Sequence, residues 1–221
     1  MKIYKFKMSV YLSDHIFKPC RSRTKSILNT IEILREILIT PQSPGADFDL
    51  VVATGKFQRI FLISNNKIYS VGFPYQIQES KDGYVSIYYD GDSEITNSLL
   101  ASAETLIKQH LQEIDSDFSA FFDTMMEELG NDNFAWKFLL KIVMQEDSYL
   151  RYDLDEKHAD DREKKDPESL IAPRIIKHPL HHIDVFYNPA HTFKIGLSGP
   201  IDLDGILDIL DPNTKCRMLG N

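Results

Sequence analysis

Cysteine is scarce in this chain of 221 residues, which contains two, Cys20 and Cys216. Small secreted domains that depend on disulfides carry more cysteines at closer spacing. A chain of this length also buries enough surface to fold without a disulfide or a structural metal. We therefore expect two reduced thiols, with a bridge between the two ends of the chain as the alternative.

Long apolar runs are also absent. A membrane-spanning helix needs roughly 18 to 20 consecutive apolar residues. The apolar stretch at residues 27–39 is interrupted by Glu32, Arg35 and Glu36. The stretch at residues 8–12, after the first lysines, is too short for the core of a signal peptide. The sequence therefore predicts a cytoplasmic protein without a membrane contact.

Several catalytic signatures are missing. The chain has no phosphate-binding Gly-x-x-x-x-Gly-Lys motif, no dinucleotide-binding Gly-x-Gly-x-x-Gly and no Cys-x-x-Cys. The glycines around Ser198 lack the spacing of a nucleophile elbow. A nuclease motif of Asp followed by Glu-x-Lys is poorly matched. With Asp184 and Lys194 in that motif, Thr192 would occupy the position of the glutamate. These enzyme classes find no support.

Positive charge is in deficit, with a formal net charge of -8. Residues 1–25 are the exception, since they hold seven basic side chains and one acidic one, Asp14. Lysines on a strand edge discourage pairing with another strand, which is one interpretation. The other is a surface that docks on nucleic acid or on an acidic protein partner.

Hydrophobic periodicity predicts the order of the elements. We expect strands at residues 4–12, 50–53, 57–63, 68–73, 75–79, 84–89, 149–154, 181–187 and 191–197. We expect helices at 24–39, from Asp92 or Ser93 to 114, at 118–129, at 134–144 and at 202–210. Ser22 or Thr24 would cap the first helix. The charge-rich residues 155–176 predict a mobile loop.

These elements predict one α+β domain spanning residues 1–221. Its antiparallel sheet would have about six or seven strands, with three longer helices packed on one face. The strands between residues 50 and 89 would form a meander, because Asn65-Asn66 and Asp82-Gly83 favour hairpin turns.

Polar residues gather in the last third of the chain. Five of the seven histidines lie between residues 158 and 191, most densely in the segment from His178 to Asp184. Side chains alternate along a strand, so His182 and Asp184 share one face and Arg151 and Asp153 share one face. If residues 149–154 pair beside residues 181–187, these four side chains meet.

Three interpretations of this cluster remain open. In the first, the polar groups of the cluster hydrogen-bond to one another and hold the 155–176 loop in place. In the second, the cluster is a binding surface for a partner or ligand. In the third, it is a metal or catalytic site. A divalent metal would be bound by His178, His181, His182 and Asp184, because imidazole and carboxylate suit such ions. Catalysis would use Arg151, Asp153, His182, Asp184 and Lys194. The two acids and His182 would transfer protons. Arg151 or Lys194 would bind an anionic group of the substrate.

The same segment carries a resemblance. The strand Arg151-Tyr152-Asp153, a charged loop and the segment from His178 to Asp184 resemble a bacterial family of small proteins with an Arg-x-Asp strand and a downstream His-Pro-x-x-His-x-His segment. The resemblance covers residues 149–210, and the sequence departs from the pattern at its last histidine. It implies a bacterial or phage-related origin but no activity.

Two functions follow as hypotheses. The first, which we favour at this point, is a non-catalytic interaction or accessory protein of a bacterial multi-protein system, such as a defence system, with a protein partner. The second is a metal-dependent hydrolase or nuclease that uses the His/Asp cluster.

Overall fold

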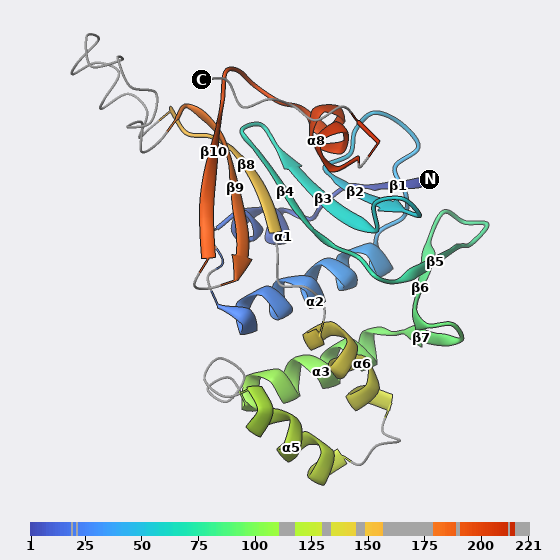
Figure 1. Cartoon of the computed structure of the whole chain (residues 1–221). Helices are drawn as coiled ribbons and strands as arrows, with labels where there is room; N and C mark the ends of the chain where they lie inside the picture. The colour runs from blue at the N-terminus through green and yellow to red at the C-terminus, as the bar shows by residue number, and fades with distance from the viewer. Residues whose placement is uncertain are drawn as a thin grey trace.

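The computed structural model describes residues 1–18, 20, 22–110, 118–129, 134–144, 149–156, 179–188, 191–211 and 213–214. Its larger sheet has seven antiparallel strands in the order β1-β2-β3-β4-β8-β9-β10 (Figure 1). These strands are β1 (Lys2–Phe6), β2 (Leu50–Thr54), β3 (Arg59–Ser64), β4 (Lys67–Gly72), β8 (Tyr149–Leu154), β9 (His181–Asn188) and β10 (His191–Leu197). The predicted α+β class and the size of the sheet are confirmed.

A second sheet of three strands contains β5 (Gln76–Glu79), β6 (Val85–Asp90) and β7 (Ser93–Ile95). The hairpin predicted at Asp82-Gly83 joins β5 to β6, and Gly83 has the positive φ of 84° that such a turn uses. The single meander predicted over residues 50–89 is wrong, however. Since β8 pairs along β4, the edge of β4 is taken and the next hairpin builds its own sheet.

Helices cover both faces of the larger sheet. Helix α1 (Val10–Ile16) and helix α2 (Arg23–Ile39) pack with one face, where Ile31 and Leu34 join Phe6 and Ile60 in a buried cluster. Helix α8 (Leu203–Leu210) covers the other face, where Ile206 lies in a separate cluster. The predicted cap of α2 is confirmed, because the Ser22 side chain accepts a hydrogen bond from the Lys25 amide.

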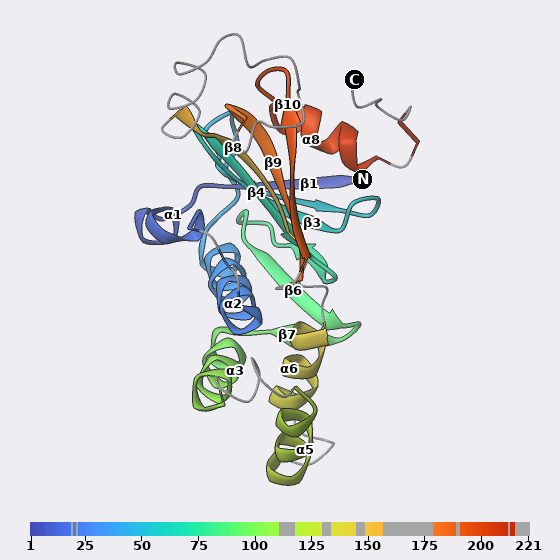
Figure 2. The same ribbon diagram turned by 60° about the vertical axis from the view of Figure 1, so that its left-hand side comes forward.

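The remaining described helices lie beyond α2, on the same side of the sheet (Figures 1 and 2). They are α3 (Asn97–Gln109), α5 (Phe118–Leu129) and α6 (Phe134–Met144). An ion pair of 2.7 Å between Arg35 and Glu104 joins α2 to α3. Trp136 of α6 packs against Phe121 and Phe122 of α5. The longer helices are thus all on one side, but α3 packs on α2, and α6 packs against Tyr89 of β6 in the smaller sheet.

The strand predicted over residues 4–12 is confirmed at its start and wrong at its end. Strand β1 ends at Phe6, and Ser9 caps α1 by accepting a hydrogen bond from the Leu12 amide. Glu36 of α2 fixes this start, since its carboxylate accepts from the Ser9 amide at 2.7 Å and from the Ser9 hydroxyl at 2.8 Å. The buried side chains Leu12 and Ile16 are spaced by four, which fits a helix better than a strand.

The predicted start of the third helix also needs correction. Residues Ser93–Ile95 form β7, and Thr96 is the cap of α3, accepting from the Leu99 amide. Residues 111–114 of the predicted helix lie outside the described residues, as do Cys216 and the predicted loop from residue 157 on. Cys20 is buried, and its thiol lies 3.5 Å from the Ser22 carbonyl oxygen. Within the described ranges, no helix is both long and apolar enough to cross a bilayer.

Candidate functional site

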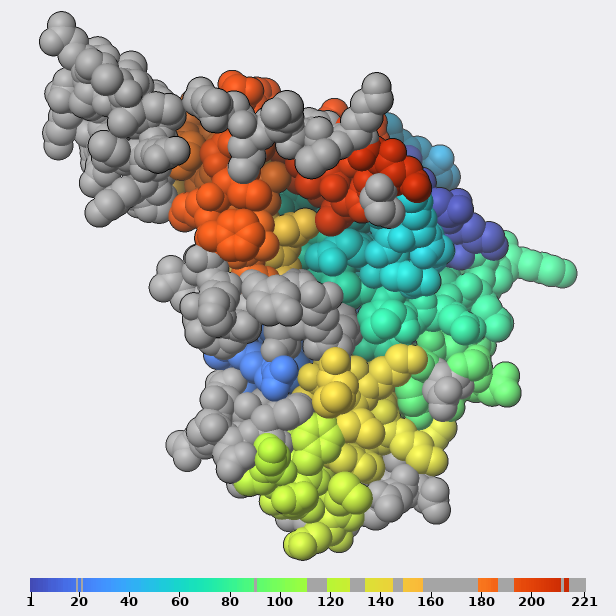
Figure 3. Space-filling model, in the orientation of Figure 1, coloured from blue at the N-terminus to red at the C-terminus, as the bar shows by residue number. Residues whose placement is uncertain are grey.

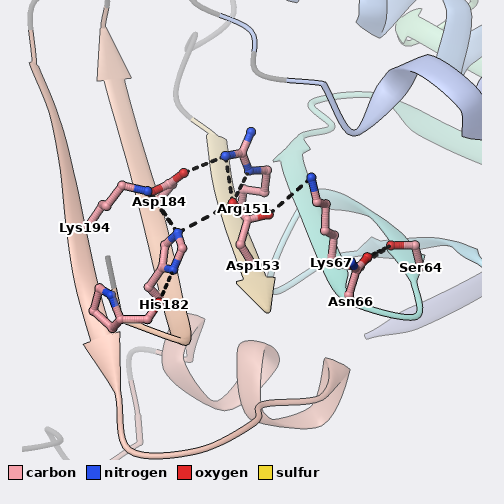
Figure 4. Close-up of polar contacts among 9 residues, drawn as sticks. Ser64, Asn66, Lys67, Arg151, Asp153, His182, Asp184 and Lys194 are labelled. Carbon is pink, nitrogen blue, oxygen red and sulfur yellow. Dashed lines mark hydrogen bonds and ion pairs between the residues drawn. The ribbon is translucent and has the colours of Figure 1, made fainter. Parts of the chain in front are cut away.

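Three neighbouring strands bring the predicted site residues together. Arg151 lies opposite Asp184 across β8 and β9, Asp153 lies opposite His182, and Lys194 of β10 lies opposite Asp184. Because facing residues point to the same side of a sheet, all five side chains share one face. Figure 4 shows them converging, and the predicted pairing of residues 149–154 with 181–187 is confirmed.

Arg151 is the centre of the cluster and is 8% exposed. Its Nε and one terminal nitrogen lie 2.9 and 2.7 Å from Asp153 Oδ2, and the same terminal nitrogen lies 2.7 Å from Asp184 Oδ2. Burial alone would lower the pKa of Arg151, but the negative charges of Asp153 and Asp184 outweigh it and the pKa is raised. Arg151 therefore fixes one oxygen of each carboxylate.

The other oxygen of each carboxylate is left with acceptor capacity by the described residues. Asp153 Oδ1 and Asp184 Oδ1 are both buried, and within the described part of the chain neither accepts one. Lys67 Nζ is 3.8 Å from Asp153 Oδ1. Lys194 Nζ is 2.6 Å from Asp184 Oδ1, an ion pair by distance that lacks hydrogen-bond geometry. These oxygens keep acceptor capacity for a cation.

His182 is held in one tautomer. Its Nδ1 lies 2.9 Å from the Pro179 carbonyl oxygen, which accepts only, so Nδ1 carries a proton. Its Nε2 lies 2.9 Å from Lys194 Nζ, an ammonium that donates only. Nε2 is therefore a lone-pair acceptor, and it lies 3.7 Å from Asp153 Oδ2 and 3.6 Å from Asp184 Oδ1. A neutral imidazole nitrogen faces two carboxylates.

Gly196, the cross-strand partner of His182, makes room for this arrangement. A Cβ at position 196 would lie 3.0 Å from Pro179 Cγ. We expect Gly196→Val to push Pro179 away, to lower the free energy of unfolding by about 1 to 3 kcal/mol and to release the His182 tautomer. Long-range ¹H–¹⁵N spectra of the imidazole would report the tautomer.

The control for this prediction is Gly199→Val, because no atom lies within 4 Å of a Cβ built at Gly199. It should leave the His182 resonances in place. An unchanged Nδ1-protonated tautomer in Gly196→Val would contradict the orienting role of Pro179.

The cluster is open on one side. The side chains of His182 and Asp153 are 1% and 9% exposed, whereas those of Asp184 and Lys194 are 17% and 34% exposed. Lys194 lies on β10, an edge of the larger sheet among the described strands. The hairpin of β9 and β10 (orange) forms part of the outer surface (Figure 3). Solvent reaches the cluster from the Lys194 side.

One predicted metal ligand, His181, is not part of this cluster. His181 points to the opposite face, where its Nδ1 lies 2.8 Å from the Tyr152 hydroxyl and its ring stacks on that tyrosine. His178 lies outside the described residues. The sequence prediction missed Lys67, which becomes a neighbour of Asp153 because β4 pairs with β8. Knowledge of the strand order would have been needed to find it.

A separate pocket of 450 Å³ lies at the end of β3, and none of the cluster residues lines it. Its lining is mixed, with Lys7, Met8, Ser13, Phe17, Phe48, Asp49, Ile63, Ser64 and Asn65. Ser64 is the cross-strand partner of Lys67, so the pocket is two strands away from Asp153.

The donor set of the cluster fits a metal ion. Asp153, His182 and Asp184 each offer one ligand atom, and these three atoms all lie within 4.8 Å of one another. At metal–ligand bonds of about 2.1 Å, neighbouring ligand atoms stand about 3 to 3.5 Å apart. His182 Nε2 lies 3.6 Å from Asp184 Oδ1, so these two atoms would need to move together only slightly. Its neighbour on Asp153, at 3.7 Å, is Oδ2, and Asp153 would have to share that oxygen between Arg151 and the ion or turn its Oδ1 toward the ion.

Known proteins add no further assignment. Comparisons with protein-family models, with curated proteins and with solved structures found no match. The geometry of the cluster must therefore carry any functional conclusion.

Proposed function

We propose that this chain is a metal-dependent hydrolase of anionic esters, in which Asp153, His182 and Asp184 bind a divalent ion. The observation that carries the proposal is the approach of one ligand atom from each of these residues to within 4.8 Å of the others. One imidazole nitrogen and two carboxylate oxygens suit several divalent metals. The Pro179 carbonyl oxygen accepts a hydrogen bond from the other imidazole nitrogen, Nδ1, an arrangement that is common around metal-bound histidines.

The three candidate ligands found among the described residues fit a catalytic role. Structural zinc sites have four protein ligands, while catalytic sites have three and keep a position for water and substrate. Here the three candidate ligands approach from β8 and β9, and the side toward Lys194 is accessible to solvent. A bound ion would lower the pKa of a water molecule on that side.

The surrounding charges favour an anionic substrate. Arg151, Lys67 and Lys194 outnumber the two carboxylates, so the cluster is positive by one charge with His182 neutral. A phosphodiester is the natural candidate, since its hydrolysis needs both a nucleophilic water and a cation beside the phosphate. The water oxygen would form a bond to phosphorus, and the bond between phosphorus and one ester oxygen would break. One proton of the water would go to the departing alcohol, and the other would go to the phosphomonoester or to solvent.

The test is hydrolysis of bis(4-nitrophenyl) phosphate by untagged protein with Mn²⁺, Mg²⁺ or Zn²⁺. We expect turnover that EDTA abolishes and that returns with metal. His182→Ala should lower the rate by about 100-fold or more, because loss of a ligand exceeds the effect of losing an outer-shell partner.

The matched control is His181→Ala, the neighbouring histidine on the opposite face of β9. It should keep the wild-type rate to within a few-fold. Equal rates in wild type and His182→Ala, or turnover that survives EDTA, would contradict the proposal.

A non-catalytic interaction role in a bacterial multi-protein system, such as a defence system, is the second candidate. It is favoured by Val10 and Tyr11, adjacent residues of α1 that are 76% and 73% exposed. Nucleic-acid binding by residues 1–25 is less supported, since Lys7 pairs with Asp47 and Asp49. Absence of both metal binding and hydrolysis would leave the interaction role. A cytoplasmic location is part of either proposal, because two cysteines in 221 residues are fewer than disulfide-dependent secreted domains carry.

A further inference from the structure

The position that a metal ion would take between Asp184 and His182 is held by an ammonium group. Lys194 Nζ lies 2.6 Å from Asp184 Oδ1 and 2.9 Å from His182 Nε2, two atoms of the candidate ligand set (Figure 4). We propose that Lys194 is the internal cation of the metal-free site, that a divalent ion displaces it, and that the displaced ammonium then binds the anionic group of the substrate. This inference rests on the proposed function.

The ammonium and a metal ion cannot share the position. Both would use the lone pair of His182 Nε2 and the Oδ1 atom of Asp184, and like charges about 3 Å apart repel strongly. Metal entry therefore requires Lys194 to leave.

The two other cations of the cluster would stay during this exchange. Arg151 binds the Oδ2 atoms of both acids, so Asp184 Oδ1 is left for whichever cation occupies the position. Lys67 lies 3.8 Å from the far oxygen of Asp153. Among the cations that the structure describes, Lys194 is the one that combines contact with two ligand atoms and a place on an edge strand, with its side chain 34% exposed.

The exchange has a measurable consequence for metal affinity. When only part of a population is competent to bind, the apparent dissociation constant rises in inverse proportion to the competent fraction. If Lys194 is withdrawn in about a tenth of the metal-free molecules, the wild-type dissociation constant is about tenfold above that of a site without the lysine. Lys194→Met, which keeps the length of the side chain and removes its charge, should therefore bind metal about tenfold more tightly.

The experiment is calorimetric titration of Mn²⁺ into metal-free protein, comparing wild type, Lys194→Met, Lys67→Met and Asp184→Asn, each checked for folding by circular dichroism. Lys67→Met makes the same change in net charge one strand away from Asp153. We expect the dissociation constant to fall about tenfold in Lys194→Met and to change by less than about threefold in Lys67→Met.

Each outcome has a separate meaning. An equal or weaker affinity in Lys194→Met, or an equal gain in both lysine variants, would overturn the exchange while the metal site stands. Loss of binding in Asp184→Asn supports the metal site independently of Lys194. No saturable binding in wild type and in Lys194→Met would overturn the metal site itself.

Discussion

Replacing Arg151 with leucine is expected to lower the free energy of unfolding by about 3 to 5 kcal/mol, the usual cost of removing one partner from a buried ion pair. The largest part of this loss is expected at Asp153. Its Oδ2 atom accepts its hydrogen bonds from Arg151, and its Oδ1 atom accepts none among the described residues. The remaining cation beside it is Lys67, at 3.8 Å. A carboxylate whose side chain is 9% exposed would be left without a hydrogen-bond donor.

For a chain of this size the expected loss corresponds to a fall in melting temperature of about 6 to 20 °C, measurable by calorimetry. Lys108→Ala is the control, because it removes an exposed i,i+4 pair with Glu104 and should leave the melting temperature close to the wild-type value. The double variant Arg151→Leu, Asp153→Leu should recover part of the loss, since apolar replacement of both partners is often near neutral. A loss below about 1 kcal/mol in Arg151→Leu would mean that Arg151 does not hold the cluster together.

Asp184→Asn is expected to weaken divalent-metal binding by about 100-fold or more. The amide keeps the shape of the side chain and an oxygen acceptor for Arg151, but it removes the negative charge of a candidate ligand. Changes to outer-shell partners alone cost about 10- to 100-fold in metal affinity, so loss of a charged ligand should cost at least as much. Equilibrium dialysis with elemental analysis would give stoichiometry and affinity.

The control for this second prediction is Asp14→Asn, which makes the same chemical change at an exposed position of α1. It should bind metal like the wild type. Stoichiometric binding with unchanged affinity in Asp184→Asn would place the metal elsewhere and contradict the site.

The sequence predicts the cluster through the alternation of side chains in two strands. Arg151 and Asp153 are two apart, as are His182 and Asp184, and this spacing puts each pair on one face whatever the rest of the fold does. The pairing of β8 with β9 then brings the two pairs into register, Arg151 opposite Asp184. The sequence predicts this pairing only as one possibility, because a long connection separates the two strands along the chain.

Other features depended on contacts that a sequence does not display. Residues 8–12 alternate like a strand, but Ser9 caps a helix there, and Glu36, far along the chain, holds Ser9 in place by accepting two hydrogen bonds from it. The second hairpin forms its own sheet because β8 takes the edge of β4. For the same reason Lys67 joins the cluster, although nothing near it in the sequence is acidic.

The most direct test of the metal site is anomalous diffraction from crystals of the wild-type protein grown with Mn²⁺. We predict one strong peak within bonding distance of Asp153, His182 Nε2 and Asp184, with Lys194 Nζ withdrawn from its present place between Asp184 and His182. A peak elsewhere, or Lys194 still in contact with both residues at saturating Mn²⁺, would contradict the account.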